Sequence, residues 1–447
     1  MTTIQPMLLP VHTNLSAMPD LCTKRSYEIN RYYGQRFSAV VIGGGAAGIA
    51  ALGNLLEDGK TDPIAWVDTE FRGGKVACAY DEVPSNTRVS FFISYATAVA
   101  AFREVIESTP TPNAFTVLAD LPQDQTCSLK YAGDLLRMLS DGLARNKRVQ
   151  CFRGLVTAVT SKDDDSTWYL GFQADGTQAQ QTLHAARVVY CTGSTPTVTT
   201  LPGLVEKKPS LLHLDLALKP SALRKAISPS TRTSVAVIGA SHSAILVLMN
   251  LVRIVRSSHP LLQIKWFTRS PTLKYAMYQD GKIFHDNTGL KGEAAEFAKE
   301  MKLDAETFET SSLRDIVTRV DCSGGATKEA EAYQRELPGC DLMIQAIGFT
   351  PNQLPDMNRK LQYDHQTGQF LDARSRTVVS GLYGAGIAFP ERVVDPSGDE
   401  EYAVGFFKFM KFLKRVSPQW VLKTDFSLQD QPSILEDISA GSISVAG

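Results

Sequence analysis

Two glycine-rich segments of the chain have the residue types and spacing that bind a dinucleotide. In the first, Gly43-x-Gly45-x-x-Gly48 follows the apolar, β-branched run 38–42 and precedes a helical apolar pattern over 49–56. A pyrophosphate is bound by backbone N–H groups at a helix N-terminus, where the helix dipole favours negative charge. Gly43 permits the tight turn, Gly45 lets the backbone approach the phosphate, and Gly48 lets the helix pack closely on the strand.

An acidic residue stands where the ribose of that dinucleotide is expected. Asp68 lies 20 residues beyond Gly48, at the end of a second predicted strand over 64–67. A carboxylate there can accept hydrogen bonds from the ribose hydroxyls, and Glu70 is the second candidate. The alternative is a glycine-rich turn without a ligand, which the spaced acid and the flanking strand and helix disfavour.

The second segment repeats this order of elements 196 positions later. Gly239-x-Ser241-x-x-Ala244 lies between the apolar run 234–238 and another helical pattern. Ser241 and Ala244 replace two of the glycines, so this motif is weaker alone, and the preceding unit strengthens it. We interpret His242, inside the turn, as a packing or capping residue rather than as an acid or base.

A basic residue follows the second strand of this repeat. Arg269 comes directly after 264–268, where an acid would accept from a ribose 2′-hydroxyl. Arginine suits a 2′-phosphate instead, so the sequence favours NADPH over NADH. Ser270 and Lys274 are expected to assist. The alternative for Arg269 is a solvated cation at the end of a strand.

The elements that must position these loops are short buried strands alternating with helices. This alternation predicts an α/β fold in which each loop lies at the carboxyl ends of parallel strands. Segments 156–160 and 168–172 predict a small antiparallel meander around a turn at 162–166. A late amphipathic helix is expected over 402–416, opened by a capping box at 397–400, with its apolar side packed on the protein rather than on a membrane.

Composition limits the class of protein. The 447 residues, 43% hydrophobic and 21% charged, are typical of a globular chain with two or three domains. The formal net charge of −1 argues against a nucleic-acid or membrane-surface partner held by a basic field. The apolar stretch 235–255 contains polar residues, so it predicts a strand, a turn and a helix, and no integral membrane segment is expected. We also predict no signal peptide.

The cysteines indicate the compartment. All seven are scattered, and none forms a C-x-x-C pair. This pattern is typical of reduced thiols in a cytoplasmic protein rather than of a disulfide framework or a zinc site, and we expect no metal.

Beyond the two loops, the chain resembles the flavoproteins with two dinucleotide-binding domains. That superfamily includes the pyridine nucleotide–disulfide oxidoreductases and the flavin-containing and N-hydroxylating monooxygenases. The resemblance covers about residues 38–415 and includes a paired-glycine stretch, two hinge motifs and a late glycine motif: Gly73-Gly74-Lys75, 188–203, 341–352 and 381–386. It implies FAD on the first loop and NAD(P)H on the second.

The resemblance also implies the domain organisation and the cofactor-binding residues. We expect two Rossmann-like, three-layer domains, with the NADPH domain inserted into a discontinuous FAD domain. The expected boundaries are an N-terminal extension (1–36), the first part of the FAD-binding domain (37–205), the NAD(P)H-binding domain (206–344), the rest of the FAD-binding domain with a flavin-facing helix (345–422) and a tail (423–447). The candidates for cofactor binding are Gly43, Gly45, Ala47, Gly48, Asp68, Gly74, Lys75, Val156, Thr192, Gly193, Gly239, Ser241, Ser243, Arg269 and Gly386. No catalytic residue is assigned.

Three positions depart from the family pattern. Ile387 follows Gly386, where the family usually has an Asp that binds the FAD. Cys78 is alone near Gly74, so a redox disulfide of the usual kind is not expected. Ala158 stands where a monooxygenase signature, F-x-G-x-x-x-H, requires histidine.

The predicted function is an FAD-dependent oxidoreductase that passes a hydride from NADPH to flavin and then electrons to a small-molecule acceptor or O₂. One alternative is a flavin monooxygenase of the N-, S- or Baeyer–Villiger type. The other is a non-catalytic flavoprotein redox sensor, which Ile387 and the missing cysteine pair would suit. The expected partner is a small-molecule substrate. A homodimer is compatible with the sequence but is not specified by it.

Overall fold

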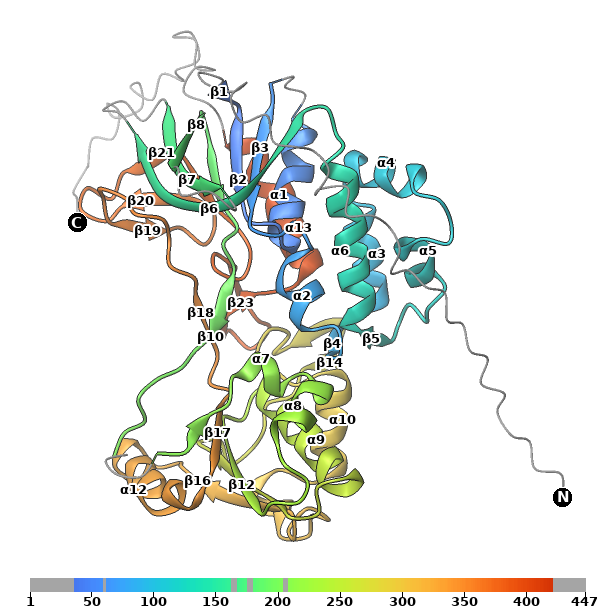
Figure 1. Ribbon diagram of the computed structural model, residues 1–447, viewed down its shortest axis with the longest axis vertical. Helices are drawn as coiled ribbons and strands as arrows, with labels where there is room; N and C mark the ends of the chain where they lie inside the picture. The colour runs from blue at the N-terminus through green and yellow to red at the C-terminus, as the bar shows by residue number, and fades with distance from the viewer. Residues whose placement is uncertain (1–35, 59–61, 162–166, 175–179, 204–207, 421–447) are drawn as a thin grey trace, which may run out of the picture. The chain divides into compact units, whose positions relative to one another are not determined.

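The computed structural model describes residues 36–58, 62–161, 167–174, 180–203 and 208–420. The expected N-terminal extension and tail therefore lie almost wholly outside the described residues, as does the turn at 162–166. The described strands form two large sheets with helices packed on them (Figure 1). This confirms the predicted α/β class with two Rossmann-like parts.

The first sheet has ten described strands and joins residues from both ends of the chain. Its order is β1-β8-β7-β6-β3-β2-β9-β21-β20-β19. The strands of the first half are β1 (Arg36–Phe37), β2 (Ala39–Ile42), β3 (Ile64–Asp68), β6 (Val149–Ser161), β7 (Trp168–Ala174), β8 (Gln180–Ala185) and β9 (Val188–Tyr190). The late strands are β19 (Leu361–Tyr363), β20 (Gln369–Asp372) and β21 (Val378–Gly384). β6, β3, β2, β9 and β21 are parallel, and β6, β7 and β8 form the predicted antiparallel meander.

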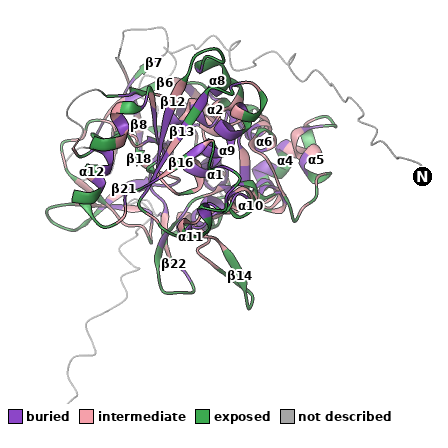
Figure 2. Ribbon diagram, turned by 90° about the horizontal axis from the view of Figure 1, so that it is seen from below, coloured by how far each residue is buried: buried purple, intermediate pink, exposed green. Residues whose placement is uncertain are grey.

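Helices from early and late parts of the chain form a layer beside this sheet. The first of them packs on the sheet, and the others pack on it or on one another. They are α1 (Ala46–Leu56), α2 (Gly74–Ala79), α3 (Val89–Ala96), α4 (Ala100–Ser108), α5 (Ala114–Ala119), α6 (Leu129–Leu143) and α13 (Phe406–Val416), and a small ribbon of β4 (Pro84–Arg88) and β5 (Thr126–Ser128) lies among them. Phe406, Met410 and Leu413 of α13 are buried, which confirms the packing interpretation of its apolar side. Helices α1 and α9 are the most completely buried of the long helices (Figure 2).

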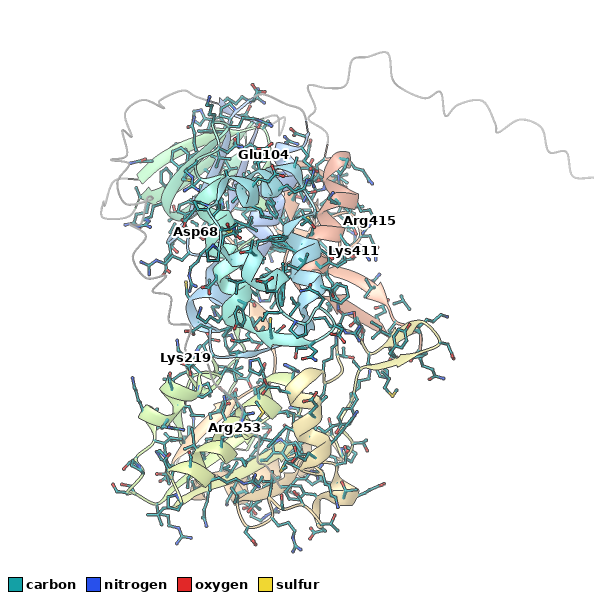
Figure 3. The ribbon with its side chains drawn as sticks, turned by 90° about the vertical axis from the view of Figure 1, so that its right-hand side faces the viewer. Asp68, Glu104, Lys219, Arg253, Lys411 and Arg415 are labelled. Carbon is teal, nitrogen blue, oxygen red and sulfur yellow. The ribbon has the colours of Figure 1, made fainter. Side chains whose placement is uncertain are left out.

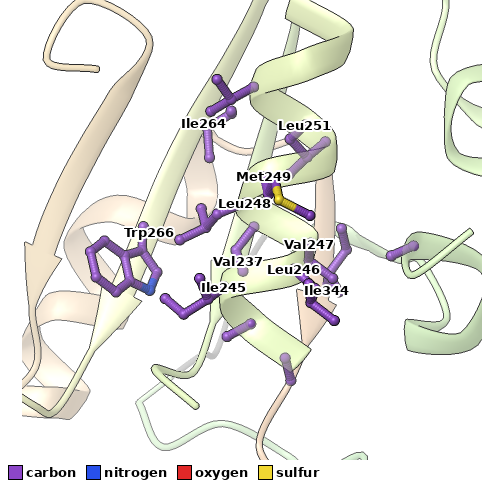
Figure 4. Packing of buried hydrophobic residues seen from close by; sticks show 14 of the residues in the cluster. Val237, Ile245, Leu246, Val247, Leu248, Met249, Leu251, Ile264, Trp266 and Ile344 are labelled. Atoms are coloured by element: carbon purple, nitrogen blue, oxygen red, sulfur yellow. The ribbon is translucent and has the colours of Figure 1, made fainter. Parts of the chain in front are cut away.

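The second sheet is entirely parallel, in the order β11-β17-β12-β13-β16. Its strands are β11 (Ser210–Leu211), β12 (Thr233–Ile238), β13 (Leu262–Thr268), β16 (Val317–Asp321) and β17 (Leu342–Gln345). The accompanying helices are α7 (Leu214–Ala217), α8 (Pro220–Ala226), α9 (His242–Ser257), α10 (Gly292–Glu300), α11 (Ala305–Phe308) and α12 (Ala326–Glu336). Figure 4 shows the core between α9 and the sheet, where Ile245 and Leu248 pack beside Val237 and Trp266.

Two adjacent connections join the parts that carry the sheets. β10 (Ser194–Pro196) pairs antiparallel with β18 (Phe349–Pro351), and the Thr197 N–H donates to the Gly348 carbonyl at 2.9 Å. All strands of the second sheet lie between these two connections in the sequence. The second sheet is therefore an insertion in the chain that builds the first.

The beginning of the late helix was predicted wrongly. Glu400–Ala403 is a strand, β23, paired with β22 (Glu391–Val394), and the helix begins only at Phe406. The Asp395 carboxylate accepts from the N–H groups of Ser397 and Asp399, so this segment forms the turn of a hairpin and not a capping box. Glu401 and Ala403 are buried and their neighbours are exposed, which is the alternation of a strand. A second hairpin joins β14 (Met277–Gln279) to β15 (Lys282–Phe284).

No single helix among the described residues combines the length and hydropathy needed to cross a membrane. The pair α3 and α4 passes that test only together, and the two helices meet at a 100° bend.

Candidate functional site

The first glycine loop lies at the carboxyl end of β2 and opens α1. Gly43 has φ +117°, and a Cβ there would lie 2.2 Å from the Cys191 carbonyl oxygen. A Cβ on Gly48 would lie 1.9 Å from the Gly43 carbonyl oxygen. Only glycine fits at these two positions, as the sequence predicts. Gly45 caps α1 without a side-chain hydrogen bond, so the first N–H groups of this helix are not covered by a capping side chain.

Asp68 lies beside this loop, at the end of β3 (Figure 3). Its Oδ2 accepts from the Gly44 N–H at 2.7 Å, and its Oδ1 accepts from the N–H groups of Glu70 and Phe71. The carboxylate therefore fixes the loop as well as standing at the predicted ribose position. Sequence reasoning missed this second role, because the pattern gives no sign of the loop's path.

Segments that are far apart in the sequence converge on the same loop. A Cβ on Gly74 would lie 2.8 Å from the Gly45 Cα, and one on Gly386 would lie 2.5 Å from the Ala47 Cβ. Both glycines have positive φ, +65° and +93°. The paired-glycine stretch and the late glycine motif thus meet the first loop, as the order of motifs predicts.

The two hinge motifs also contact each other. The Asn352 side-chain amide donates to the Thr192 carbonyl at 2.7 Å, and the Asn352 N–H donates to the Gly193 carbonyl at 3.0 Å. The Thr192 hydroxyl is buried without a hydrogen-bond partner among the described residues. A buried hydroxyl normally has a partner, so this group fits a site that receives a polar ligand.

The remaining candidates of the first part have different surroundings. Lys75, at the start of α2, forms an ion pair with Asp215 of α7 at 3.1 Å. Tyr80 donates to the same carboxylate at 2.7 Å. Val156 is buried within β6.

The second glycine loop repeats the geometry of the first. Gly239 has φ +127°, and a Cβ there would lie 2.2 Å from the Ala346 carbonyl oxygen. Ser241 caps α9 without a side-chain hydrogen bond, and Ser243 lies in the first turn of this helix.

A tryptophan holds each loop in the same way, and sequence reasoning missed both. The Trp66 indole N–H of β3 donates to the Gly43 carbonyl at 3.0 Å, and the Trp266 indole N–H of β13 donates to the Gly239 carbonyl at 2.7 Å. The signal was available, because each tryptophan is the third residue from the end of the second strand of its repeat.

Arg269 lies at the same edge of the second sheet as the Gly239 loop. The Gly239 N–H donates to the Phe267 carbonyl at 3.0 Å, and Arg269 follows β13 directly. Its side chain is 71% exposed but is not free, since it pairs with Glu329 of α12. Of its expected assistants, Lys274 forms an ion pair with Asp399, and the Ser270 carbonyl accepts from Arg319.

His242 is the first residue of α9. Its Nδ1 is buried without a hydrogen-bond partner among the described residues. Burial, with a smaller effect of the Lys291 charge, lowers the pKa of His242 to about 4. The imidazole is therefore neutral near pH 7, which agrees with its interpretation as a packing residue.

The described cysteines are free thiols without signs of activation. Cys78 is exposed, while Cys191, Cys322 and Cys340 are buried. Burial raises the pKa of Cys191 to about 12, and burial followed by the Glu70 charge raises the pKa of Cys78. A thiolate nucleophile needs a lowered pKa, so these environments do not suit dithiol chemistry.

One further group of titratable side chains gathers outside the two loops. Ligand atoms of His285, Asp395 and Asp399 lie within 4.8 Å of one another. The group joins the two hairpins, since His285 pairs with Asp395 at 3.1 Å and Lys274 pairs with Asp399 at 3.3 Å. These contacts account for the cluster as a structural contact between the hairpins.

Comparison with known proteins identifies the family. The model of the pyridine nucleotide-disulphide oxidoreductase family matches residues 37–393. The chain belongs to this family. Membership confirms the predicted superfamily, so the protein is an oxidoreductase that uses FAD and a pyridine nucleotide through two dinucleotide-binding domains.

A relative and several solved structures extend this comparison. The chain is 49% identical over 396 residues to monooxygenase AgnR1 of Paecilomyces divaricatus, covering 87% of this chain and 98% of the relative. The fold is similar to that of DfoA, a cadaverine monooxygenase of Erwinia amylovora solved with FAD, with a TM-score of 0.54, 12% identity, and coverage of 89% of this chain and 99% of that one. It is also similar to the ornithine N-hydroxylase KtzI of Kutzneria sp. 744, with a TM-score of 0.54, 12% identity, and coverage of 86% and 99%.

Proposed function

We propose that this protein is an NADPH-dependent flavin monooxygenase that acts on a small molecule. The observation that carries the proposal is the relative named a monooxygenase, which is 49% identical to this chain over 98% of its own length. The thiols also support the proposal. Cys78 is the cysteine nearest in sequence to the paired glycines, and its pKa is raised, whereas a redox-active thiol needs a lowered pKa. O₂ rather than a protein disulfide is then the acceptor of the flavin's electrons.

The residues of the first loop suit FAD. The N-terminus of α1 would hold the pyrophosphate, with Asp68 beside the ribose and the Thr192 hydroxyl offering an unpaired polar contact. Gly74 and Gly386 carry no side chain, so their segments can lie directly against this loop. When bound, the flavin accepts a hydride and activates O₂, while the chain binds and orients it.

The second loop is assigned to NADPH. The N-terminus of α9 would hold its pyrophosphate, and Arg269 at the end of β13 would bind its 2′-phosphate. We place the protein in a reducing compartment such as the cytosol, because its described cysteines are free.

Anaerobic reduction followed by mixing with O₂ tests this function. The purified holoenzyme should absorb near 450 nm, lose that absorbance with NADPH, and regain it rapidly with O₂. Addition of the right small molecule should couple NADPH oxidation to incorporation of one atom of labelled O₂ into a product. A protein that binds no FAD would contradict the proposal, as would NADPH oxidation that yields only peroxide with every compound tested.

A further inference from the structure

The arginine at the end of β13 is held by one buried carboxylate. Glu329 Oε1 accepts a hydrogen bond from Arg269 Nε at 2.9 Å and lies 2.7 Å from Arg269 Nη2 in an ion pair. We propose that Glu329 is a positioning residue, which orients Arg269 toward the 2′-phosphate of NADPH. This inference rests on the proposed assignment of NADPH to the second loop.

Burial makes this carboxylate rigid. The Glu329 side chain is only 8% exposed, whereas that of Arg269 is 71% exposed. The same Oε1 also accepts from the Tyr333 hydroxyl at 2.8 Å, one turn further along α12. Phe267 of β13 packs against the Tyr333 ring, with ring centroids 5.6 Å apart. The acceptor for the arginine is thus fixed by the core of the domain and not by another mobile side chain.

The geometry leaves the outer part of the guanidinium available. The contacts with Glu329 involve Nε and Nη2, which form one edge of the planar group. Nη1 takes no part in these contacts, the side chain as a whole is 71% exposed, and a guanidinium presents its donors in a fixed fork that matches phosphate oxygens. Because Arg269 is ordered before the ligand arrives, binding does not have to restrict its rotamers again.

The backbone that follows Arg269 is fixed as well. Arg319 donates to the Ser270 carbonyl at 2.8 Å, and its guanidinium lies over the Trp266 ring, 5.5 Å from the centroid. Trp266 in turn donates to Gly239 of the glycine loop. The arginine and the pyrophosphate loop are therefore parts of one connected framework.

The direction of the change in affinity for the phosphate ligand distinguishes this proposal from simple charge compensation. A carboxylate beside Arg269 opposes the attraction of a phosphate, so removal of the charge alone would tighten binding. If orientation decides, loss of the acceptor atom weakens binding instead. Glu329→Gln keeps an acceptor oxygen in place, and Glu329→Ala removes it.

Calorimetric titration of the holoenzyme with 2′,5′-ADP and with 5′-ADP makes this test without turnover. We expect Glu329→Ala to bind 2′,5′-ADP about three- to tenfold more weakly than the native protein, the range that ordering one long side chain provides. Binding of 5′-ADP should be unchanged in both variants, and Glu329→Gln should restore most of the affinity for 2′,5′-ADP. In steady state, Glu329→Ala should raise KM for NADPH in the same proportion and leave kcat and the NADH kinetics alone.

Glu336→Ala is the matched control, because Glu336 pairs with Lys265 between the same helix and the same strand at 2.8 Å. It should leave both titrations unchanged. Native or tighter binding of 2′,5′-ADP by Glu329→Ala overturns the proposal, as does an equal loss of affinity for 5′-ADP.

Arg269→Ala separates this inference from the proposed function. If that variant loses its preference for 2′,5′-ADP while Glu329→Ala does not, only the positioning role fails. If Arg269→Ala keeps the preference, the NADPH assignment itself fails. In the Arg269→Ala background, Glu329→Ala should have no further effect on the ratio of the two affinities.

Discussion

At the scale of single residues, two tryptophans stabilise the two nucleotide loops through one hydrogen bond each. Replacement by phenylalanine removes the indole N–H and leaves the carbonyl of Gly43 or Gly239 without its donor. We expect Trp66→Phe and Trp266→Phe each to lower the free energy of unfolding by about 1 kcal/mol, the net contribution of one hydrogen bond to a partly buried carbonyl. Urea unfolding monitored by circular dichroism measures this loss.

The two substitutions should differ in the cofactor they affect. Trp66→Phe is expected to weaken FAD binding and leave 2′,5′-ADP binding intact, and Trp266→Phe should do the reverse. Each variant is therefore the control for the other. An equal effect of either substitution on both ligands would show that the tryptophans act only on global stability.

His242 gives a residue-scale prediction for the dependence of stability on pH. Burial lowers its pKa in the folded chain from 6.5 to about 4. Between these values the unfolded chain takes up a proton that the folded chain excludes, so stability is full above pH 6.5 and falls as the pH drops towards 4. The slope from this one group is at most about 1.4 kcal/mol per pH unit. Urea unfolding at pH 7, 6 and 5 should therefore show that the free energy of unfolding falls more steeply for the native protein than for His242→Gln. If it falls equally in both, the imidazole is not held neutral by burial in the folded chain.

Residue types and spacing were enough to predict Gly43, Gly48 and Gly239, because positive φ or close backbone approach leaves no other choice at these positions. They were not enough for Glu329. That carboxylate meets Arg269 from 60 positions away, through the packing of α12 on β13, and nothing local in the sequence marks it. For the same reason, the hydrogen bond from Gly44 to Asp68 was not foreseen.

At the scale of elements, helix α6 positions the paired-glycine stretch. A Cβ on Gly133 of α6 would lie 2.9 Å from the Ala77 Cα, in the backbone of α2. Gly133→Ala should push α2 away, displace Gly74 from the first loop and cost about 1–3 kcal/mol of stability. We expect weaker FAD binding, measured by fluorescence titration of the FAD-free protein.

Gly142→Ala, nine residues later on α6, is the matched control. Its Cβ would lie 2.3 Å from a methyl group of Val105 on α4. The substitution therefore crowds the same helix, but against α4 and not against α2. It should lower stability and leave FAD affinity unchanged. If the two substitutions weaken FAD binding equally, α6 does not act through α2.

The elements around the loops were predictable because a strand, a glycine turn and a helix follow each other within a few residues. The start of the late helix was not predictable, because a hairpin precedes it and determines where it begins. Asp395 accepts the N–H groups of a turn, and Glu401 is buried against Asn287 and Thr288 of the inserted segment. A capping-box pattern cannot be distinguished from such a turn until the tertiary partner of Glu401 is known.

At the scale of the whole molecule, the second sheet is an insertion whose ends meet. Thr195 pairs with Thr350, and Thr197 and Gly348 are joined by a backbone hydrogen bond. Contacts between the two parts are both polar and apolar. Lys219, labelled in Figure 3, forms an ion pair with Asp81 at 2.8 Å, and Val83 of the first part packs in the core around α9. Each part has a sheet and a buried core of its own. The motif order predicted this arrangement, whereas the polar contacts between the parts could not be predicted.

The insertion should therefore fold alone. We expect residues 197–348 to unfold cooperatively and to bind 2′,5′-ADP, because they contain the five-stranded sheet and every buried residue of the core around α9 except Val83. The remaining chain, with residues 196 and 349 joined by a two-residue turn, should close a hairpin of β10 and β18 and still bind FAD. A mixture of the two pieces should oxidise NADPH far more slowly than the intact protein, because nothing holds the two cofactors together.

A segment that begins at residue 230 is the control, since it omits Ala217 and Leu223, which are fully buried in that core. If 197–348 is as unfolded as that shorter segment, the two parts form a single cooperative unit.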